Sequence, residues 1–385
     1  MDRPEPPLRK RTVEERRRWW LESSRATASQ RRFLETPDLG LADVLVENAV
    51  GWMPVPLGVV SGLVVNEVRY EVPLATEEPS VIAAASYAAS LAARAGGFRA
   101  GAAEPVMRAQ IFLENVDADA EARLEAARPV LEAQVRGRLA SMARRGGGLR
   151  ALSLARLEPD LAVVRLDVDV RDALGANLLN TLAETLSPAL EETLGGAKLL
   201  AVLSNDASLR PAWAEVRLPY ALLSKTAVRV DLTGPEMARR ITAASRLAQL
   251  DPQRAVTHNK GIMNGVSALA LATANDTRAL EAAVHAGAAA SGTYRGLSRW
   301  NDDGEALTGR IEMNLALAVV GGSVGTHPTA RMALRLLGDP DAPALCSIAA
   351  ALGLAQNFAA LFALAGEGIQ RGHMKLHDRR KSALE

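Results

Sequence analysis

The sequence predicts an α+β protein in which a β-α-β-β-α-β unit is joined to a larger part built mostly of helices. Between residues 106 and 203, strand-like and helix-like segments follow one another in that order, which is the order of the ferredoxin-like fold. From residue 255 onward the chain is rich in Ala, Gly and Leu, which is typical of closely packed helices. Hydrophobic residues make up 48% of the 385 residues and charged residues 23%, the balance of a folded globular protein.

The first half of this unit is predicted to be a strand, a helix and a second strand. The strand covers residues 106–116. The helix begins near Pro129 and ends at Gly146-Gly147-Gly148, because proline suits a first helical turn and glycine suits a helix end. Residues 149–157 form the second strand. Apolar residues at helical spacing define the face that should pack on the sheet: Val130, Leu131, Val135, Leu139 and Met142.

The second half is predicted to be a strand, a helix and a final strand. Residues 163–170 alternate between apolar and charged side chains, as in a strand with one buried face. Leucines recur every four residues from Leu178 to Leu194 and predict a helix that ends at Gly195-Gly196. The last strand covers residues 198–203. The four strands and two helices together predict the split β-α-β arrangement.

Residues 1–46 are predicted to form a small helical lead-in. Thr12 followed by Glu15 has the pattern of a capping box. The basic run from Arg9 to Arg18 is interpreted as the solvated face of a short helix rather than as a nucleic-acid-binding arm. Further along, the alanine-rich segment 80–95 predicts a helix that ends at Gly96-Gly97.

The net charge and the cysteine content indicate which binding partners and which cellular compartment to expect. Lys and Arg number 45 and Asp and Glu 44, so the net charge of +1 gives no reason to expect nucleic acid or a membrane as partner. The only cysteine, Cys346, excludes an intrachain disulfide, and its apolar neighbours predict a buried side chain in a cytoplasmic protein. No secretory signal is expected, and no uninterrupted apolar run reaches the roughly 18 residues of a membrane span.

Common signatures of phosphate and metal sites are absent from the sequence. It has no G-x-x-x-x-G-K-[ST] loop and no G-x-G-x-x-G after a strand. His373 and His377 have the spacing of a zinc pair, but Met374 stands where the zinc-protease motif has Glu. No third ligand accompanies them, so we expect no metal site, and a metal hydrolase is disfavoured.

Four segments concentrate polar groups in apolar surroundings: residues 77–80, 257–265, 273–276 and 368–374. Each has a simple structural explanation. Glu78 could favour a helix N-terminus, and Asn275 or Asp276 could cap the helix that follows. Lys260 could be a charge on a loop, and His373 could be an exposed residue at a helix start. Spacing alone does not join these segments into one site.

Further motifs accompany these segments: Glu47-Asn48-Ala49-Val50-Gly51, Glu77-Glu78-Pro79-Ser80-Val81, Asp172-Ala173-Leu174-Gly175-Ala176-Asn177, residues 322–328 and Gly372-His373-Met374. With the segments around Lys260 and Asp276, they resemble 3-hydroxy-3-methylglutaryl-CoA (HMG-CoA) reductase, most closely the bacterial class II branch. The resemblance runs from about residue 40 to residue 377, which is nearly the whole chain.

The resemblance implies reduction of HMG-CoA to mevalonate by two hydrides from a nicotinamide cofactor, with release of CoA. It places the four catalytic residues at Glu78, Lys260, Asp276 and His373. The Lys260 ammonium would stabilise the oxyanion formed at the thioester carbonyl, and Asp276 beside it would keep it charged. His373 as an imidazolium would protonate the departing thiolate, and Glu78 would supply the proton for the aldehyde oxygen.

The resemblance also implies the ligand contacts. The residues that match substrate contacts are Ser80, Arg254, Asn264, Gln356 and His377. The residues that match cofactor contacts are Asp172, Ala173, Leu174, Gly175, Asn177 and Asn205, with Leu174 where the family often has Met. This motif would place a helix N-terminus at the cofactor pyrophosphate without a Rossmann fold.

The implied architecture is a large substrate domain interrupted by a cofactor domain. The expected boundaries are a lead-in at 1–46, an HMG-CoA-binding domain at 47–102 and 211–370, an inserted nicotinamide-cofactor domain at 103–210, and the start of a C-terminal flap at 371–385. Active sites in this family form between two subunits, so a homodimer is the smallest expected assembly. Only 12 residues follow His373, fewer than the family's flap, which leaves a non-catalytic CoA-ester-binding homologue as the alternative.

The resemblance also bears on cofactor choice. NADH-dependent class II members carry an Asp in the helix before the Gly-Gly-Gly turn, where a carboxylate repels a 2′-phosphate. Counting back without a gap places Leu139 there, and no acid occurs from Gln134 to Gly148. The segment carries four arginines instead: Arg136, Arg138, Arg144 and Arg145. Guanidinium groups bind phosphate, so we expect NADPH to serve at least as well as NADH. The sequence does not indicate whether mevalonate is made or degraded.

Overall fold

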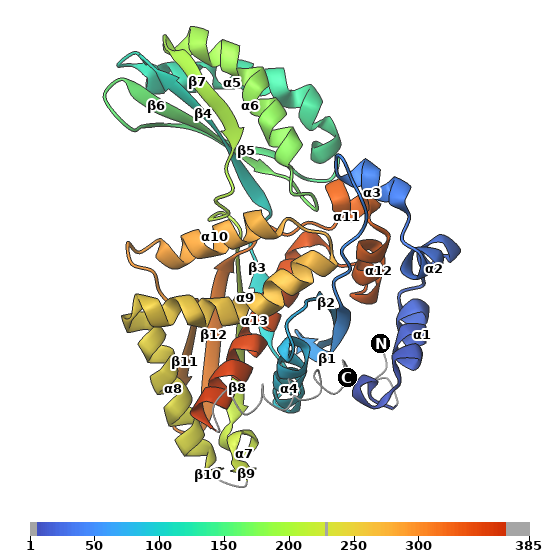
Figure 1. Cartoon of the computed structure of the whole chain (residues 1–385). Helices are drawn as coiled ribbons and strands as arrows, with labels where there is room; N and C mark the ends of the chain where they lie inside the picture. Colours follow the sequence, from blue (N-terminus) through green and yellow to red (C-terminus); the bar gives the residue numbers. More distant parts are fainter. Residues whose placement is uncertain (1–5, 228–229, 367–385) are drawn as a thin grey trace.

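The structure, a computed structural model, describes residues 6–227 and 230–366. Figure 1 shows a smaller unit, cyan to green at the top of the view, above a larger body. The chain enters this inserted unit (residues 103–210) after β3 (Arg99–Ala102) and leaves it before β8 (Pro211–Pro219). Because β3 and β8 pair with each other in the body, the two chain crossings lie side by side.

The inserted unit is an antiparallel sheet covered by two helices. Its strand order, β5-β6-β4-β7, is that of the ferredoxin-like fold, and the predicted element order is confirmed. Alternate residues of the strands point into one core with both helices, as expected for a sheet with one covered face. The elements are β4 (Val106–Glu114), α5 (Ala120–Ala143), β5 (Gly148–Arg156), β6 (Leu161–Asp169), α6 (Ala176–Leu194) and β7 (Ala197–Leu203).

Helix α5 differs from the prediction at its start. It begins at Ala120, so Pro129 lies inside the helix and not in its first turn. The reason is that the buried stripe extends back through Leu124 to Ala120, and packing along this stripe outweighs the backbone bond that proline removes. Val130 was expected on the buried face but is 63% exposed.

The body contains a second four-stranded sheet of order β11-β12-β8-β3. Its hairpin, β11 (Ser298–Asp302) and β12 (Ala306–Asn314), corrects the expectation that the chain is helical from residue 255 onward. In β12 buried residues such as Ile311 and Met313 alternate with exposed charged ones, a period-two pattern that the overall Ala- and Leu-rich composition obscures.

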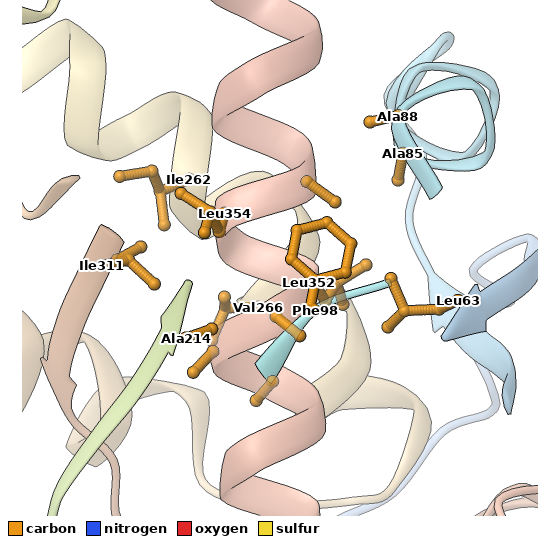
Figure 2. Packing of buried hydrophobic residues seen from close by; sticks show 14 of the residues in the cluster. Leu63, Ala85, Ala88, Phe98, Ala214, Ile262, Val266, Ile311, Leu352 and Leu354 are labelled. Carbon is orange, nitrogen blue, oxygen red and sulfur yellow. The ribbon is translucent and has the colours of Figure 1, made fainter. Parts of the chain in front are cut away.

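Helix α13 (Ala342–Ala365) forms the centre of the body. Figure 2 shows Leu352 and Leu354 of α13 packed among side chains of the surrounding helices and strands, including Ile262 and Val266. Its residues are buried on nearly every side, which explains why the helix is apolar all round. Among the described helices it is the one long and apolar enough to cross a membrane, but 78% of its most apolar window is buried inside the protein.

The other body elements surround this helix. A two-stranded sheet, β1 (Leu57–Val65) and β2 (Val68–Ala75), leads into α4 (Val81–Arg94). Helices α8 (Gly234–Leu250), α9 (Pro252–Ala272) and α10 (Thr277–Ala289) precede the β11–β12 hairpin. The shorter elements are α7 (Tyr220–Leu223), β9 (Lys225–Ala227), β10 (Val230–Leu232), α11 (Gly322–Thr326) and α12 (Pro328–Leu336).

The N-terminal segment comprises a 3-10 turn (Leu8–Lys10), α1 (Val13–Ser23), α2 (Ala28–Glu35) and α3 (Leu39–Leu45). Of these, α1 and α2 pack against α12. Thr12 and Glu15 form both hydrogen bonds of the expected capping box at α1. Trp20 of α1 is buried with Met332 and Leu336 of α12, so this small core fixes the lead-in to the body.

Candidate active site

The structure brings two of the predicted catalytic groups together. Lys260 Nζ donates to Glu78 Oε2 over 2.9 Å. Lys260 lies in the middle of α9, so the interpretation of its segment as a loop is wrong. Glu78 lies in the turn between β2 and α4, where its amide donates to Thr76 Oγ1. The Lys260 side chain is 62% exposed and that of Glu78 35%, so this ion pair faces solvent and is accessible to a ligand.

Ser80 adopts a strained backbone conformation beside this pair. Its φ is +75°, in the left-handed region that costs a residue with a Cβ about 1–2 kcal/mol. It precedes α4 as the N-cap residue, yet its side chain makes no capping hydrogen bond. Backbone strain of this kind clusters at functional sites. The Ser80 hydroxyl, two residues from Glu78, does not cap the helix.

Asp276 is the N-cap of α10. Its Oδ1 accepts from the amides of Arg278 and Ala279, and the Arg278 guanidinium lies 3.3 Å away. Within residues 6–227 and 230–366, Asp276 forms its ion pair with Arg278 and Lys260 forms its ion pair with Glu78, so no ion pair joins Asp276 to Lys260. The physical reason is that the carboxylate satisfies the first free amides of α10.

Three of the five residues matched to substrate contacts lie on two helices of the body. Arg254 and Asn264 lie on α9, and Gln356 lies on the central helix α13. Partial burial lowers the pKa of Arg254 from its ordinary value. Gln356 is buried, and its Oε1 has no hydrogen-bond partner within the described part of the protein, although buried polar atoms are normally paired. Gln356 Oε1 is therefore an acceptor in need of a donor.

Behind Lys260, α9 is held by a buried polar network that sequence reasoning missed. His258 Nε2 lies 2.7 Å from Ser298 Oγ, which donates to Asn357 Oδ1 over 2.8 Å. Asn259 clamps the segment before β11, bonding the carbonyl of Arg295 and the amide of Leu297. Burial, with the nearby positive charge of Arg254, lowers the pKa of His258 to about 4. The imidazole is thus neutral, and no spacing rule would have linked these residues to a strand.

The predicted cofactor motif forms the connection from β6 to α6. Asp172 Oδ1 accepts from the Ala342 amide at the start of α13 over 3.1 Å. The Asp172 carbonyl accepts from the amide of Val319 over 2.9 Å, and Ala173 forms a bridge with Val320. Leu174 packs against the core of the inserted unit. The motif is therefore fixed to both the unit and the body.

The motif ends in an uncapped helix N-terminus. Gly175 has φ +80°, and a Cβ there would lie 2.4 Å from Val170 Cγ1, so the position requires glycine. Among the residues that the structure describes, no side chain caps α6, and Asn177 in its first turn is exposed. Free amides at the start of a 19-residue helix are donors for an anionic ligand. A pocket of about 210 Å³ at the junction of unit and body borders this motif at Arg171 and Asp172.

Leu139, the residue expected to face the cofactor ribose, lies in the core of the inserted unit. It is 6% exposed and packs with Val135 and Met142 on the face of α5 that covers the sheet. Counting back from Gly146-Gly147-Gly148 without a gap therefore points to a residue on the buried face of α5 and not on its exposed face. Asn205 is exposed in the loop after β7, where a ligand contact is sterically open.

Comparisons with known proteins identify the family of this chain. The family model described as "Hydroxymethylglutaryl-coenzyme A reductase" matches residues 12–378. The chain belongs to the HMG-CoA reductase family. It is 41% identical over 347 residues to the 3-hydroxy-3-methylglutaryl-coenzyme A reductase of Archaeoglobus fulgidus, covering 89% of this chain and 77% of that one. It is 37% identical to the probable enzyme of Borreliella burgdorferi, covering 86% and 76%.

Solved structures of the HMG-CoA reductase family match as well. A class II enzyme from Streptococcus pneumoniae, solved bound to NADPH in open conformations, matches with a TM-score of 0.85 and 40% identity over 93% of this chain and 98% of that one. A second structure of the S. pneumoniae enzyme matches with a TM-score of 0.87 and 39% identity over 98% and 91%. The expected α+β fold and family are thereby confirmed.

As an HMG-CoA reductase, the protein is an NAD(P)H-dependent oxidoreductase that interconverts HMG-CoA with mevalonate and CoA by two hydride transfers. The described residues fit a dinucleotide, because the uncapped start of α6 offers amide donors of the kind that bind a pyrophosphate. His373, His377 and the expected flap at 371–385 lie outside the described residues.

Proposed function

We propose that Lys260 and Glu78 form the reacting centre of this reductase. The observation that supports this is their 2.9 Å contact in an open position next to the strained Ser80. Lys260 Nζ stabilises the negative charge that develops on the thioester oxygen and later on the aldehyde oxygen. Glu78, which contacts Lys260 Nζ through Oε2, delivers a proton to the aldehyde oxygen when its carboxyl group is protonated and is left as the carboxylate. Two NAD(P)H molecules, bound one after the other, would each supply one hydride.

Asp276 and His373 complete the proposed set. His373 protonates the CoA thiolate as it leaves, because an imidazolium near neutral pH is suited to that step. Asp276 in its present position holds the N-terminus of α10, and we propose that its carboxylate adds negative potential on the Lys260 side of the site. The remaining proposed substrate contacts are Ser80, Arg254, Asn264, Gln356 and His377.

We propose that residues 103–210 form the cofactor domain, with 47–102 and 211–370 forming the HMG-CoA domain. The 2′-phosphate of NADPH would be bound near the end of α5. The Gly146–Gly148 turn packs against Asp169 and Arg171, directly before Asp172, and the arginines before it are exposed. No acid stands in this segment. The S. pneumoniae relative has been solved bound to NADPH, which supports binding of this cofactor.

A homodimer is the proposed assembly. The segment around the Glu47–Gly51 motif exposes large apolar side chains, with Val50 100% exposed and Met53 87% exposed. Val44 and Val46 are exposed as well. Several large apolar side chains in one short exposed segment mark an interaction surface. We expect a cytoplasmic enzyme without nucleic-acid or membrane partners, which the near-zero net charge and the buried Cys346 support.

The reacting centre is tested by Lys260→Ala, with Lys10→Ala as the matched control for loss of an exposed lysine. Removal of one oxyanion donor costs roughly 10²–10³ in kcat, so we expect a loss of that size for Lys260→Ala and none for Lys10→Ala. Steady-state assays should be run toward mevalonate and toward HMG-CoA, because the same groups serve both directions. Near-normal turnover of Lys260→Ala would remove Lys260 from the mechanism.

A further inference from the structure

A buried strap (Leu315–Val320) runs between β12 and α11 and touches both parts of the protein. It belongs to no helix and to none of the sheets, yet Leu315, Leu317 and Ala318 are almost fully buried. Its backbone groups therefore need partners from other segments. Those partners come from both proposed halves of the active site.

One edge of the strap is bonded to the inserted unit. The Leu315 amide donates to the carbonyl of Arg210 over 3.0 Å, and Arg210 Nη2 donates back to the Leu317 carbonyl over 2.9 Å. Val319 donates to the carbonyl of Asp172 over 2.9 Å. Arg210 is the last residue of the inserted unit and Asp172 belongs to the cofactor motif, so this edge follows the unit's position.

The residue between these, Ala318, is bonded on the other side. Its amide donates to Asn275 Oδ1 over 2.7 Å, and its carbonyl accepts from Asn275 Nδ2 over 3.0 Å. The second proton of Asn275 Nδ2 goes to Thr273 Oγ1 over 2.9 Å. The Asn275 side chain is thus buried, and both its oxygen and its nitrogen hydrogen-bond to Ala318 of the strap.

Asn275 stands immediately before Asp276 in the turn between α9 and α10. Its own amide donates to the Ala270 carbonyl over 2.8 Å, which fixes the turn to the end of α9, the helix that carries Lys260. A short path of hydrogen bonds therefore runs from Asp276 through Asn275 and Ala318 to the next strap residue, and from there to Asp172. No other side chain in the described part of the protein bonds both backbone groups of Ala318.

We propose that Asn275 is a positioning residue that holds Asp276 in register with the cofactor motif through this strap. The inference rests on the proposed role of Asp276. Asn275 does not touch a ligand; it sets where the Asp276 carboxylate stands relative to the segment that binds the cofactor. Loss of its amide should reduce turnover and leave the KM for HMG-CoA within twofold of the wild-type value.

The test is a double-mutant cycle with Asn275→Ala and Asp276→Asn. If Asn275 acts through Asp276, Asn275→Ala lowers kcat at least tenfold in the wild-type background and less than twofold in the Asp276→Asn background. The isosteric Asn275→Asp keeps the side-chain volume but removes both donors, so it should show the same background dependence without a cavity. The matched control is Asn66→Ala, because Asn66 clamps both backbone groups of Ala100 in the same way, far along the chain from either motif.

The outcomes separate the inference from the proposed function. Equal loss of kcat in both backgrounds, or a loss no larger than that of Asn66→Ala at equal thermal stability, would show a structural role for Asn275 and overturn the inference. Full activity of Asp276→Asn would instead overturn the proposed role of Asp276. If Asn275→Ala does not fold, the same comparison is made with Asn275→Asp.

Discussion

The two halves of the proposed active site are built in opposite ways. Lys260 projects into solvent from a helix that is held on another face by His258 and Asn259, and within the described part of the chain its side chain forms one ion pair, with Glu78. In the cofactor motif the backbone itself is fixed, by the strap and by the start of α13. The difference follows from what each half offers a ligand. A side-chain ammonium can turn toward different oxygens, whereas backbone amides that bind phosphate must already be in place.

The largest effect expected on the chemical half is that of His373→Gln. A general acid contributes typically 10²–10⁴ in rate, so reduction of HMG-CoA should fall by about that factor. Reduction of free mevaldehyde should be nearly unchanged, because it releases no thiolate. Both substrates are compared by kcat in steady-state assays. Equal losses of kcat on the two substrates would show that His373 does not protonate the thiolate, and would weaken the comparison between the two halves of the site.

The buried network around His258, which holds α9 behind Lys260, should make the folded protein less stable in acid. The pKa of His258 is lowered from 6.5 to about 4, so between these values the unfolded chain binds a proton that the folded protein does not. Stability is therefore complete above pH 6.5 and falls as the pH drops toward 4, by about 3 kcal/mol for a shift of this size. Urea unfolding of wild type and His258→Gln at a series of pH values measures this, and parallel pH profiles would contradict it.

The preference between NADPH and NADH should depend on the charge at the end of α5. Replacing Arg144 and Arg145 together by Glu puts repulsion where we propose the 2′-phosphate binds, so the ratio of kcat/KM for NADPH to that for NADH should fall at least tenfold. The matched control is the pair Arg136→Glu and Arg138→Glu, on exposed positions earlier in the same helix. A larger change in the control pair would move the phosphate site back along α5.

The smallest expected effect concerns Ser80. Ser80→Gly relieves the left-handed backbone strain and should raise the free energy of unfolding by about 1 kcal/mol, while loss of the hydroxyl raises the KM for HMG-CoA. Ser80→Ala loses the same hydroxyl but keeps the strain, so only Ser80→Gly should gain stability. Thermal melts and steady-state kinetics of both variants separate the two contributions. An unchanged KM in both would show that the hydroxyl has no ligand.

The inserted unit was predictable because its contacts are local and regular. The leucines from Leu178 to Leu194 and the alternation along β6 each mark one buried face, and the structure buries those faces. Pro129 misled the prediction because proline preferences describe isolated helices, whereas here the stripe through Leu124 decides where α5 begins. The error at Leu139 came from counting residues without knowing the helix face.

The body was less predictable because its contacts join distant segments. β3, β8 and β12 become neighbours although the whole inserted unit separates the first two along the chain. In the site, motif resemblance indicated Glu78 and Lys260 as two of the catalytic residues, and the structure places these two side chains in contact. The buried partners of His258, namely Ser298 and Asn357, lie about 40 and 99 residues away and belong to no motif. Tertiary geometry alone reveals such pairs.

The position of α13 has a consequence for how the chain is made. The inserted unit is one continuous stretch, so all of its core-forming residues have been synthesised once the ribosome has passed β7. The body cannot close at that point, because its sheet and α4 pack around a helix that is translated only after residue 341. Until then the faces of α4 and β8 that pack against α13 have no cover. The growing polypeptide therefore carries a folded inserted unit beside the exposed apolar surface of the unfinished body. Chaperones act on intermediates of this kind during synthesis.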